Sequence, residues 1–127
     1  MLNWLRVSLV LGLLVVAIPP ANAQQALSKS LVQCHVVTDV VVKAATPEQQ
    51  NLDMVKFFAD ASKAFEEAAF KQAHREGLAD VSDYVAKVKT EAQAYWQPKL
   101  HDPSASAEYG EWVEYCTALG DELKLPL

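Results

Sequence analysis

The chain contains 127 residues, of which 51% are hydrophobic and 21% are charged. Arg6 is the only charged side chain among the first 23 residues, so the other 104 residues carry 10 basic and 16 acidic side chains, a net charge of −6. Their apolar content excludes an acidic disordered tail. Their negative balance disfavours a nucleic-acid-binding protein, because such a protein needs a basic face.

The first 23 residues have the composition of a secretory signal peptide. One basic residue precedes an uncharged and mostly apolar run over residues 7–18, and two prolines end that run. Ala21 and Ala23 are the small residues that signal peptidase requires, which predicts cleavage before Gln24. The run is shorter than the roughly 20 apolar residues of a membrane-spanning helix. We therefore expect a Sec-type signal peptide and a periplasmic or secreted protein with no stable membrane anchor after cleavage. An uncleaved anchor is the alternative.

Export determines how the two cysteines are interpreted. Cys34 and Cys116 lie near opposite ends of the predicted mature chain, and in an oxidising compartment they are expected to pair. The loop between them is 82 residues long, for which chain entropy gives a stabilisation of about 4 to 5 kcal/mol. A redox-active pair is not expected, because the chain has no Cys-x-x-Cys motif.

The mature part, residues 24–127, is predicted to be a single helical domain. Its first helix covers residues 27–45. A run of β-branched residues over 35–42 favours a strand by local propensity, but the apolar spacing over the longer window predicts a helix. The residues at helical spacing are Leu27, Leu31, Cys34, Val37, Val41 and Ala44.

The second helix has the clearest start. Thr46 can cap it, Pro47 suits the first helical position, and Gln49 can return the capping-box bond. Gly77 is the expected stop. The side chains predicted to face inward are Leu52, Val55, Phe58, Phe65 and Ala69, with Met54, Phe57 and Ala61 widening the stripe.

Two further helices follow. The third begins at Asp80 or Ser82 and fades before Pro98, and the fourth opens at Asp102 and ends at Gly120. Inward positions are Val81, Tyr84, Val85, Val88, Ala92 and Tyr95 or Trp96 in the third, and Tyr109, Trp112, Val113, Cys116 and Leu119 in the fourth. Short connections make consecutive helices antiparallel. We therefore expect an all-α fold, a four-helix up-down bundle with one disulfide joining the first and last helices.

Cofactor chemistry finds little support in the sequence. The pair Cys34-His35 resembles the end of a c-type haem motif, but Leu31 stands where the first cysteine would fall. A disulfide cysteine followed by an exposed or capping histidine is the preferred interpretation. His35, His74 and His101 lack metal-ligand spacing, so we expect neither a metal nor a cofactor.

Catalytic motifs are also absent from the sequence. It has no Gly-x-Ser-x-Gly, no P-loop and no Gly-rich phosphate cradle, so we expect a protein that is not an enzyme. Most carboxylates fall on predicted solvated faces. Glu108, Glu111, Glu114 and Tyr115 form the candidate partner surface on the last helix, although a partly buried tyrosine with a wet hydroxyl is the commoner explanation. Ser62 and Thr38 are the evident polar groups on apolar faces.

An Ala-x-Ala signal, a helical domain near 100 residues, and cysteines at positions 34 and 116 give the chain a layout that resembles the small uncharacterised exported helical proteins of Gram-negative bacteria. This resemblance implies an all-α periplasmic protein and carries no assigned activity. The chain is loosely similar to periplasmic acid-stress chaperones and helical immunity proteins. The first functional hypothesis is a non-enzymatic module that binds another periplasmic protein. The alternatives are a bundle that binds haem or another small molecule, and an acid-stress chaperone or immunity-type protein.

Overall fold

The computed structural model describes residues 25–127, so the predicted signal peptide, with Ala21, Ala23 and Gln24, lies outside the described part. The described residues form four α-helices and no strand, which confirms the all-α prediction for this part of the chain. In chain order the elements are α1 (Leu27–Ala44), η2 (Gln49–Asn51), α2 (Asp53–Arg75), α3 (Val81–Trp96), η3 (Gln97–Lys99), η4 (Pro103–Ala105) and α4 (Ser106–Glu122), where η marks a 3-10 turn.

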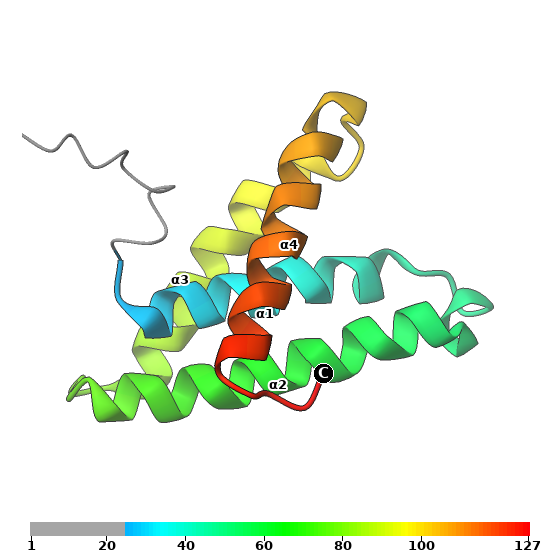
Figure 1. The fold of residues 1–127 in the computed structure, drawn as a ribbon. Helices are drawn as coiled ribbons and strands as arrows, with labels where there is room; N and C mark the ends of the chain where they lie inside the picture. Colours follow the sequence, from blue (N-terminus) through cyan, green and yellow to red (C-terminus); the bar gives the residue numbers. More distant parts are fainter. Residues whose placement is uncertain (1–24) are drawn as a thin grey trace, which may run out of the picture.

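The four helices are arranged around α1. Figure 1 shows α1 and α2 side by side and running in opposite directions, with α3 and α4 rising across that pair. The helix α1 contacts each of the other three. The up-down bundle is therefore not confirmed, since α3 and α4 do not continue alongside the first pair in this view.

The central position of α1 explains why its β-branched segment is helical and not a strand. Ten of the 18 residues of α1 are buried, including Val36, Val37 and Val40, and they lie around its circumference. A helix that is covered on several sides needs apolar residues on several sides. Burial of these valines outweighs their modest intrinsic preference for a strand.

The start of the second helix differs from the sequence prediction. The capping box forms, because the Thr46 amide donates to Gln49 Oε1 at 2.9 Å and the Gln49 amide donates to Thr46 Oγ1 at 3.3 Å. It caps the short turn η2, however, and extended backbone at Leu52 separates that turn from α2. The predicted helix over 47–76 is thus a turn followed by a shorter helix.

The ends of α2 and α4 share one motif. Gly77, at φ 76°, ends α2 as predicted: its amide donates to the His74 carbonyl and the Leu78 amide to Ala73. The prediction that Gly120 ends the fourth helix is wrong. Gly120 is buried inside α4, where a side chain would collide with Leu127 of the C-terminal tail that folds back over it. Lys124, at φ 55°, holds the left-handed position at that end instead.

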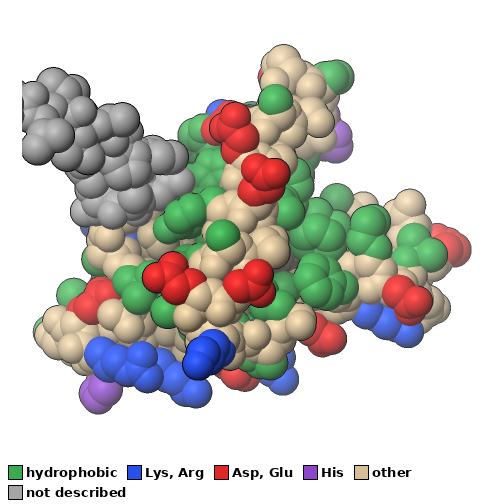
Figure 2. Space-filling view, in the orientation of Figure 1, with side chains coloured by type: hydrophobic (Ala, Val, Ile, Leu, Met, Phe, Trp, Pro, Cys, Tyr) green, Lys and Arg blue, Asp and Glu red, His purple; other side chains and the backbone are tan. Residues whose placement is uncertain are grey.

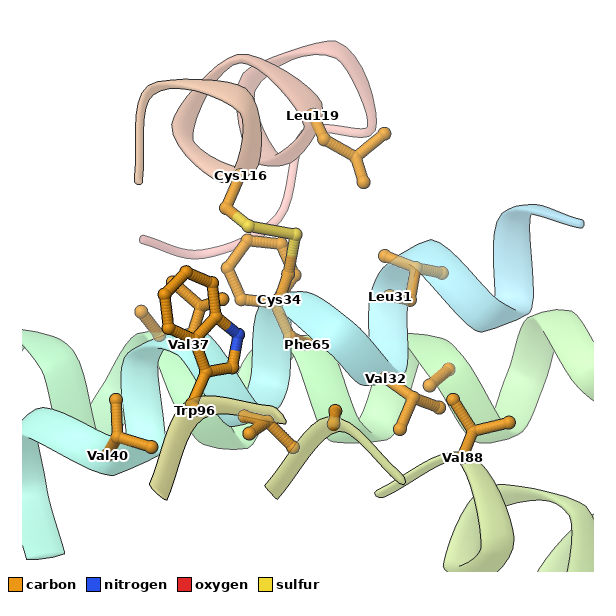
Figure 3. Close-up of a cluster of buried hydrophobic side chains, with 14 of the residues drawn as sticks. Leu31, Val32, Cys34, Val37, Val40, Phe65, Val88, Trp96, Cys116 and Leu119 are labelled. Atoms are coloured by element: carbon orange, nitrogen blue, oxygen red, sulfur yellow. A yellow bond between two sulfur atoms is a disulfide. The ribbon is translucent and has the colours of Figure 1, made fainter. Parts of the chain in front are cut away.

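The core is centred on the disulfide. Cys34 and Cys116 are both buried, and their Cα atoms lie 5.5 Å apart, which confirms the predicted link between the first and last helices. In Figure 3 the disulfide lies among side chains from all four helices, with Phe65 of α2 below it and Trp96 of α3 beside it. Trp96 is therefore the inward residue of the Tyr95–Trp96 pair, and Tyr95 is 47% exposed.

Candidate binding cleft

An open cleft lies where the two helix pairs diverge. One wall is the C-terminal half of α1 with η2 and the first turn of α2, and the other is the segment from the end of α3 to the start of α4. The cleft has a volume of about 550 Å³. Its apolar lining, called the apolar cleft below, consists of Val40, Val41, Ala44, Ala45, Leu52, Met54, Val55, Trp96, Leu100, Pro103, Ala105 and Tyr109.

Large apolar side chains at the mouth of the apolar cleft are exposed to solvent. Met54 is 61% exposed, Leu52 50% and Leu100 40%, and Phe57 beside them on α2 is 50% exposed. Figure 2 shows hydrophobic side chains gathered between the two arms of the molecule. The prediction that Leu52, Met54 and Phe57 face the core is wrong, because the first turn of α2 projects beyond the part of α1 that covers its apolar face.

The floor of the cleft is closely packed. Val55 and Trp96 are almost fully buried, and Trp96 packs edge-on against Tyr109 with ring centroids 5.5 Å apart. The Tyr109 hydroxyl donates to the Val37 carbonyl at 2.6 Å. Burial of this phenol raises its pKa to about 12, so it stays neutral and keeps donating at any physiological pH.

A polar clasp fixes the upper wall. Lys99 Nζ lies 3.0 Å from Glu108 Oε2 and 3.8 Å above the ring of Tyr95, whose hydroxyl donates to the other oxygen of Glu108. The hydrogen bond from Tyr95 and the contact with Lys99 hold the pKa of Glu108 below its ordinary value. This clasp ties the end of α3 to the start of α4 and so fixes one side of the cleft.

The structure divides the predicted partner surface. Glu108 points back into the clasp, whereas Glu111 and Glu114 are exposed and make no hydrogen bond or ion pair within residues 25–127. Tyr115 is half-buried, with its ring edge-on to Trp112 at 5.8 Å. Only the two outer glutamates are therefore free to meet a partner.

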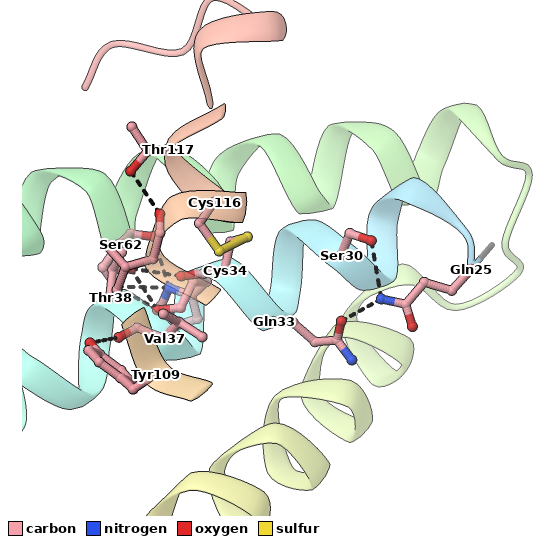
Figure 4. The surroundings of a disulfide bond; sticks show 12 residues. Gln25, Ser30, Gln33, Cys34, Val37, Thr38, Ser62, Tyr109, Cys116 and Thr117 are labelled. Atoms are coloured by element: carbon pink, nitrogen blue, oxygen red, sulfur yellow. Dashed lines mark hydrogen bonds between the residues drawn. A yellow bond between two sulfur atoms is a disulfide. The ribbon is translucent and has the colours of Figure 1, made fainter. Parts of the chain in front are cut away.

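A second polar cluster lies inside the molecule, and the prediction of an exposed or capping His35 is wrong. His35 is 6% exposed, and its Nδ1 lies 2.8 Å from the Ser62 carbonyl oxygen and 2.9 Å from Ser62 Oγ. Its Nε2 lies 3.1 Å from Glu66 Oε2, without the alignment of a hydrogen bond. Thr38 Oγ1 donates to carbonyls of its own helix. Figure 4 shows Ser62 and Thr38 close to the disulfide.

This cluster links three helices. Glu66 of α2 meets His35 of α1 on one side and Lys89 of α3, at 2.8 Å, on the other. The hydrogen bond from Lys89, followed by the charge interaction with His35, lowers the pKa of Glu66 against the opposing effect of burial. The Ser–His–Glu order resembles that of a nucleophile, base and acid, but Ser62 is 4% exposed and does not line the apolar cleft. The cluster acts as a clamp between helices.

Further structural findings concern haem attachment, metal binding and membrane-spanning helices. Cys34 is bonded to Cys116, so its sulfur is not free to attach haem. Residues 25–127 bring together no group of three or more potential metal ligands. Within this range, no helix is both long enough and apolar enough to cross a membrane. His101 lines the cleft at its rim, and His74 is exposed near the end of α2.

Searches of protein-family models, curated proteins and solved structures with this chain return no match. The cleft itself was not predicted from the sequence. The signal that could have indicated it is the crowding of apolar side chains at the start of α2, where Leu52, Met54 and Phe57 exceed what one buried stripe needs.

Proposed function

We propose that this chain is an exported, non-enzymatic interaction module that binds an apolar segment of another protein in the apolar cleft. The observation that carries the proposal is the exposure of Leu52, Met54 and Leu100 around one concave surface. Contiguous exposed apolar surface of this kind is unfavourable in water and marks binding sites in soluble proteins.

A protein segment suits the cleft better than a small molecule does. Small-molecule sites orient their ligands with a few convergent polar groups. Of the polar residues in this cleft, Lys99 is held by Glu108, Asp102 accepts hydrogen bonds from Ser104, and Gln49 is paired with Thr46. His101 and Ser106 remain as polar groups of the lining. A cleft with few free polar groups is better suited to the apolar surface of a protein segment than to a small molecule that must be held in one orientation.

The test is position-specific photo-crosslinking in cells that make the protein. A photoreactive residue at Met54 should give a discrete protein adduct, whereas the same residue at Lys63, exposed farther along α2, should give none. Leu100→Asp, on the opposite wall, should weaken the Met54 adduct at unchanged protein level. Equal adducts from both positions, or no effect of Leu100→Asp, would contradict the proposal.

The small-molecule alternative rests on one observation, the cleft volume of about 550 Å³, which lies within the range of ligand pockets. A ligand that binds only the folded state raises the melting temperature. Thermal melts against a metabolite panel, for the wild type and Met54→Asp, separate the two functions. A shift that disappears in Met54→Asp would favour the small-molecule binder.

A further inference from the structure

Accessible sulfur in residues 25–127 is confined to one side chain. The whole sequence has two cysteines and two methionines. Cys34 and Cys116 are bonded to each other and buried, so neither offers a thiol. Met1 belongs to the predicted signal peptide and lies outside the described residues. Met54 therefore carries the one sulfur of residues 25–127 that is neither bonded to another sulfur nor buried.

Met54 is also the most exposed of the large apolar side chains in this range. It is 61% exposed, compared with 50% for Leu52 and Phe57 and 40% for Leu100. A dissolved oxidant reaches a methionine in solvent more readily than one in a core, and no thiol competes for it here. Sulfur oxidation of the described part of the chain is therefore directed to Met54.

The position of Met54 separates the binding surface from the core. Met54 lines the apolar cleft together with Leu52 and Leu100. It does not belong to the cluster of buried side chains around the disulfide, and its own exposure shows that little of the fold covers it. A change of polarity at Met54 thus alters the surface of the cleft while the packing of the core stays the same.

An oxygen atom on this sulfur would change what the cleft can bind. Oxidation converts a flexible apolar side chain into a polar sulfoxide. An apolar segment that covers the sulfoxide would remove its oxygen from water without supplying a hydrogen bond, which is unfavourable. Lys99, a donor in the lining of the cleft, is held by Glu108 and is not free to compensate.

We propose that Met54 is a site of reversible oxidation by hydroperoxides, and that its sulfoxide prevents the apolar cleft from binding its partner. This inference rests on the proposed function and adds the regulation of that site. In the forward step the Met54 sulfur attacks one peroxide oxygen, a sulfur–oxygen bond forms and the oxygen–oxygen bond breaks. The proton of the transferred oxygen passes to the leaving oxygen, which departs as water or an alcohol. In the reverse step a methionine sulfoxide reductase removes the oxygen as water while two of its thiols become a disulfide.

The experiment uses the disulfide-bonded protein and an uncharged synthetic amphipathic helix, with Leu on one face and Gln on the other, as the probe of the cleft. Hydrogen peroxide is added until mass spectrometry shows the gain of one oxygen atom, and peptide fragmentation assigns that atom to Met54. Fluorescence anisotropy then compares probe binding before and after treatment. We expect the sulfoxide to weaken binding by about fivefold or more, as for one unsatisfied buried acceptor. The melting temperature should not change, and the reductase should restore binding.

Matched variants assign the effect to one sulfur atom. Met54→Leu keeps an apolar side chain and should bind the probe like the untreated wild type, both before and after peroxide. Met54→Gln places a polar amide at the mouth of the cleft and should bind as weakly as the sulfoxide. The control Met54→Leu/Leu123→Met moves the methionine to a position that is 37% exposed and outside the cleft lining. This control should gain one oxygen atom with no change in binding.

The outcomes separate this inference from the function on which it rests. If the Met54 sulfoxide binds the probe as tightly as the untreated protein, while Met54→Asp weakens binding, the cleft functions as proposed and its regulation by oxidation is wrong. If the untreated wild type and Met54→Asp bind the probe equally, the proposed function fails as well.

Three further results would overturn the inference alone. Loss of binding in peroxide-treated Met54→Leu would place the effect on another group. A lowered melting temperature of the sulfoxide would show that binding is lost through unfolding. Resistance of Met54 to peroxide that oxidises the relocated methionine of the control would show that Met54 is not the preferred site.

Discussion

Two helix ends in this protein use the same left-handed backbone conformation with different side chains. Gly77 follows α2 at φ 76°, and Lys124 follows α4 at φ 55°. At both ends the two amides after the helix return to its last turn. Glycine adopts this conformation freely, whereas for a residue with a Cβ it costs about 1 kcal/mol or more. The end of α4 therefore holds a small amount of strain that the end of α2 does not.

Lys124→Gly should stabilise the protein by about 0.5 to 1 kcal/mol, because relief of the left-handed strain exceeds the extra freedom of glycine in the unfolded chain. Chemical denaturation measures the change. The control Lys63→Gly, in the exposed middle of α2, should destabilise by about 1 kcal/mol. A loss of stability in both variants would show that Lys124 is not strained.

At the scale of helices, most of each element could be predicted, whereas their mutual arrangement could not. The start and end of α1 and α3 follow from apolar spacing and from Asp80, whose side chain accepts the Asp83 amide at 3.0 Å. Capping signals report local hydrogen bonds, and the Thr46 signal is correct at that level although it starts a 3-10 turn. A capping motif predicts where a helical turn begins but not how long the element after it will be.

The candidate site was the least predictable part for a related reason. Leu52 and Met54 have the spacing of core residues, and only the position of α1 and α3 decides that they remain uncovered. His35 likewise became a buried clamp because Ser62 and Glu66, one turn apart on α2, lie on either side of its ring. These outcomes depend on how helices cross, which a periodic pattern does not specify.

The disulfide matters most for α4. This helix contacts α1 more than it contacts α2 or α3, and the bond between Cys34 and Cys116 crosses that one interface. Removal of both cysteines, as Cys34→Ala/Cys116→Ala, should lower the free energy of unfolding by up to about 4 to 5 kcal/mol, a large share of the 5 to 15 kcal/mol typical of a domain.

Hydrogen exchange can show which helix loses stability when the disulfide is removed. In the variant, amides of α4 should exchange faster relative to the wild type than amides in the centre of α2, where contacts with α1 are extensive. Equal acceleration in both helices would mean that the disulfide stabilises the whole domain evenly. Thiol titration of the unreduced wild type should find no free cysteine.

For the whole molecule, carboxylates couple the fold to pH. Glu76 holds the start of α1: its carboxylate accepts from the Ser28 amide at 3.1 Å and from the Ser28 hydroxyl. Burial opposes ionisation of Glu76, but the hydrogen bonds from Ser28 and Gln72 outweigh it and lower its pKa. The pKa of Glu66 is also lowered, chiefly by Lys89. Both groups bind a proton more readily in the unfolded chain than in the folded one.

The stability that these two carboxylates contribute should therefore be fully present above the ordinary glutamate pKa of 4.5. It should be lost as the pH falls through their lower pKa values in the folded protein. Urea denaturation at pH 7, 5, 4 and 3 measures this dependence. Glu76→Gln should flatten the curve, whereas Glu67→Gln, at an exposed position, should not.

The same acid series tests the acid-stress chaperone. Loosened helices would expose apolar surface and bind a hydrophobic dye below about pH 4. An unchanged dye signal down to pH 3 would exclude that alternative.

The central position of α1 has a consequence for how the chain folds. Synthesis makes α1 first, yet the helix that covers it last, α4, contains the final cysteine. The side of α1 that faces α4 therefore stays uncovered until nearly the whole chain has emerged, and during that time it can bind chaperones or aggregate. Because the chain has only two cysteines, one intramolecular pairing exists. Maturation then requires a thiol oxidant but no disulfide isomerase, and closure of this single bond marks the completed fold.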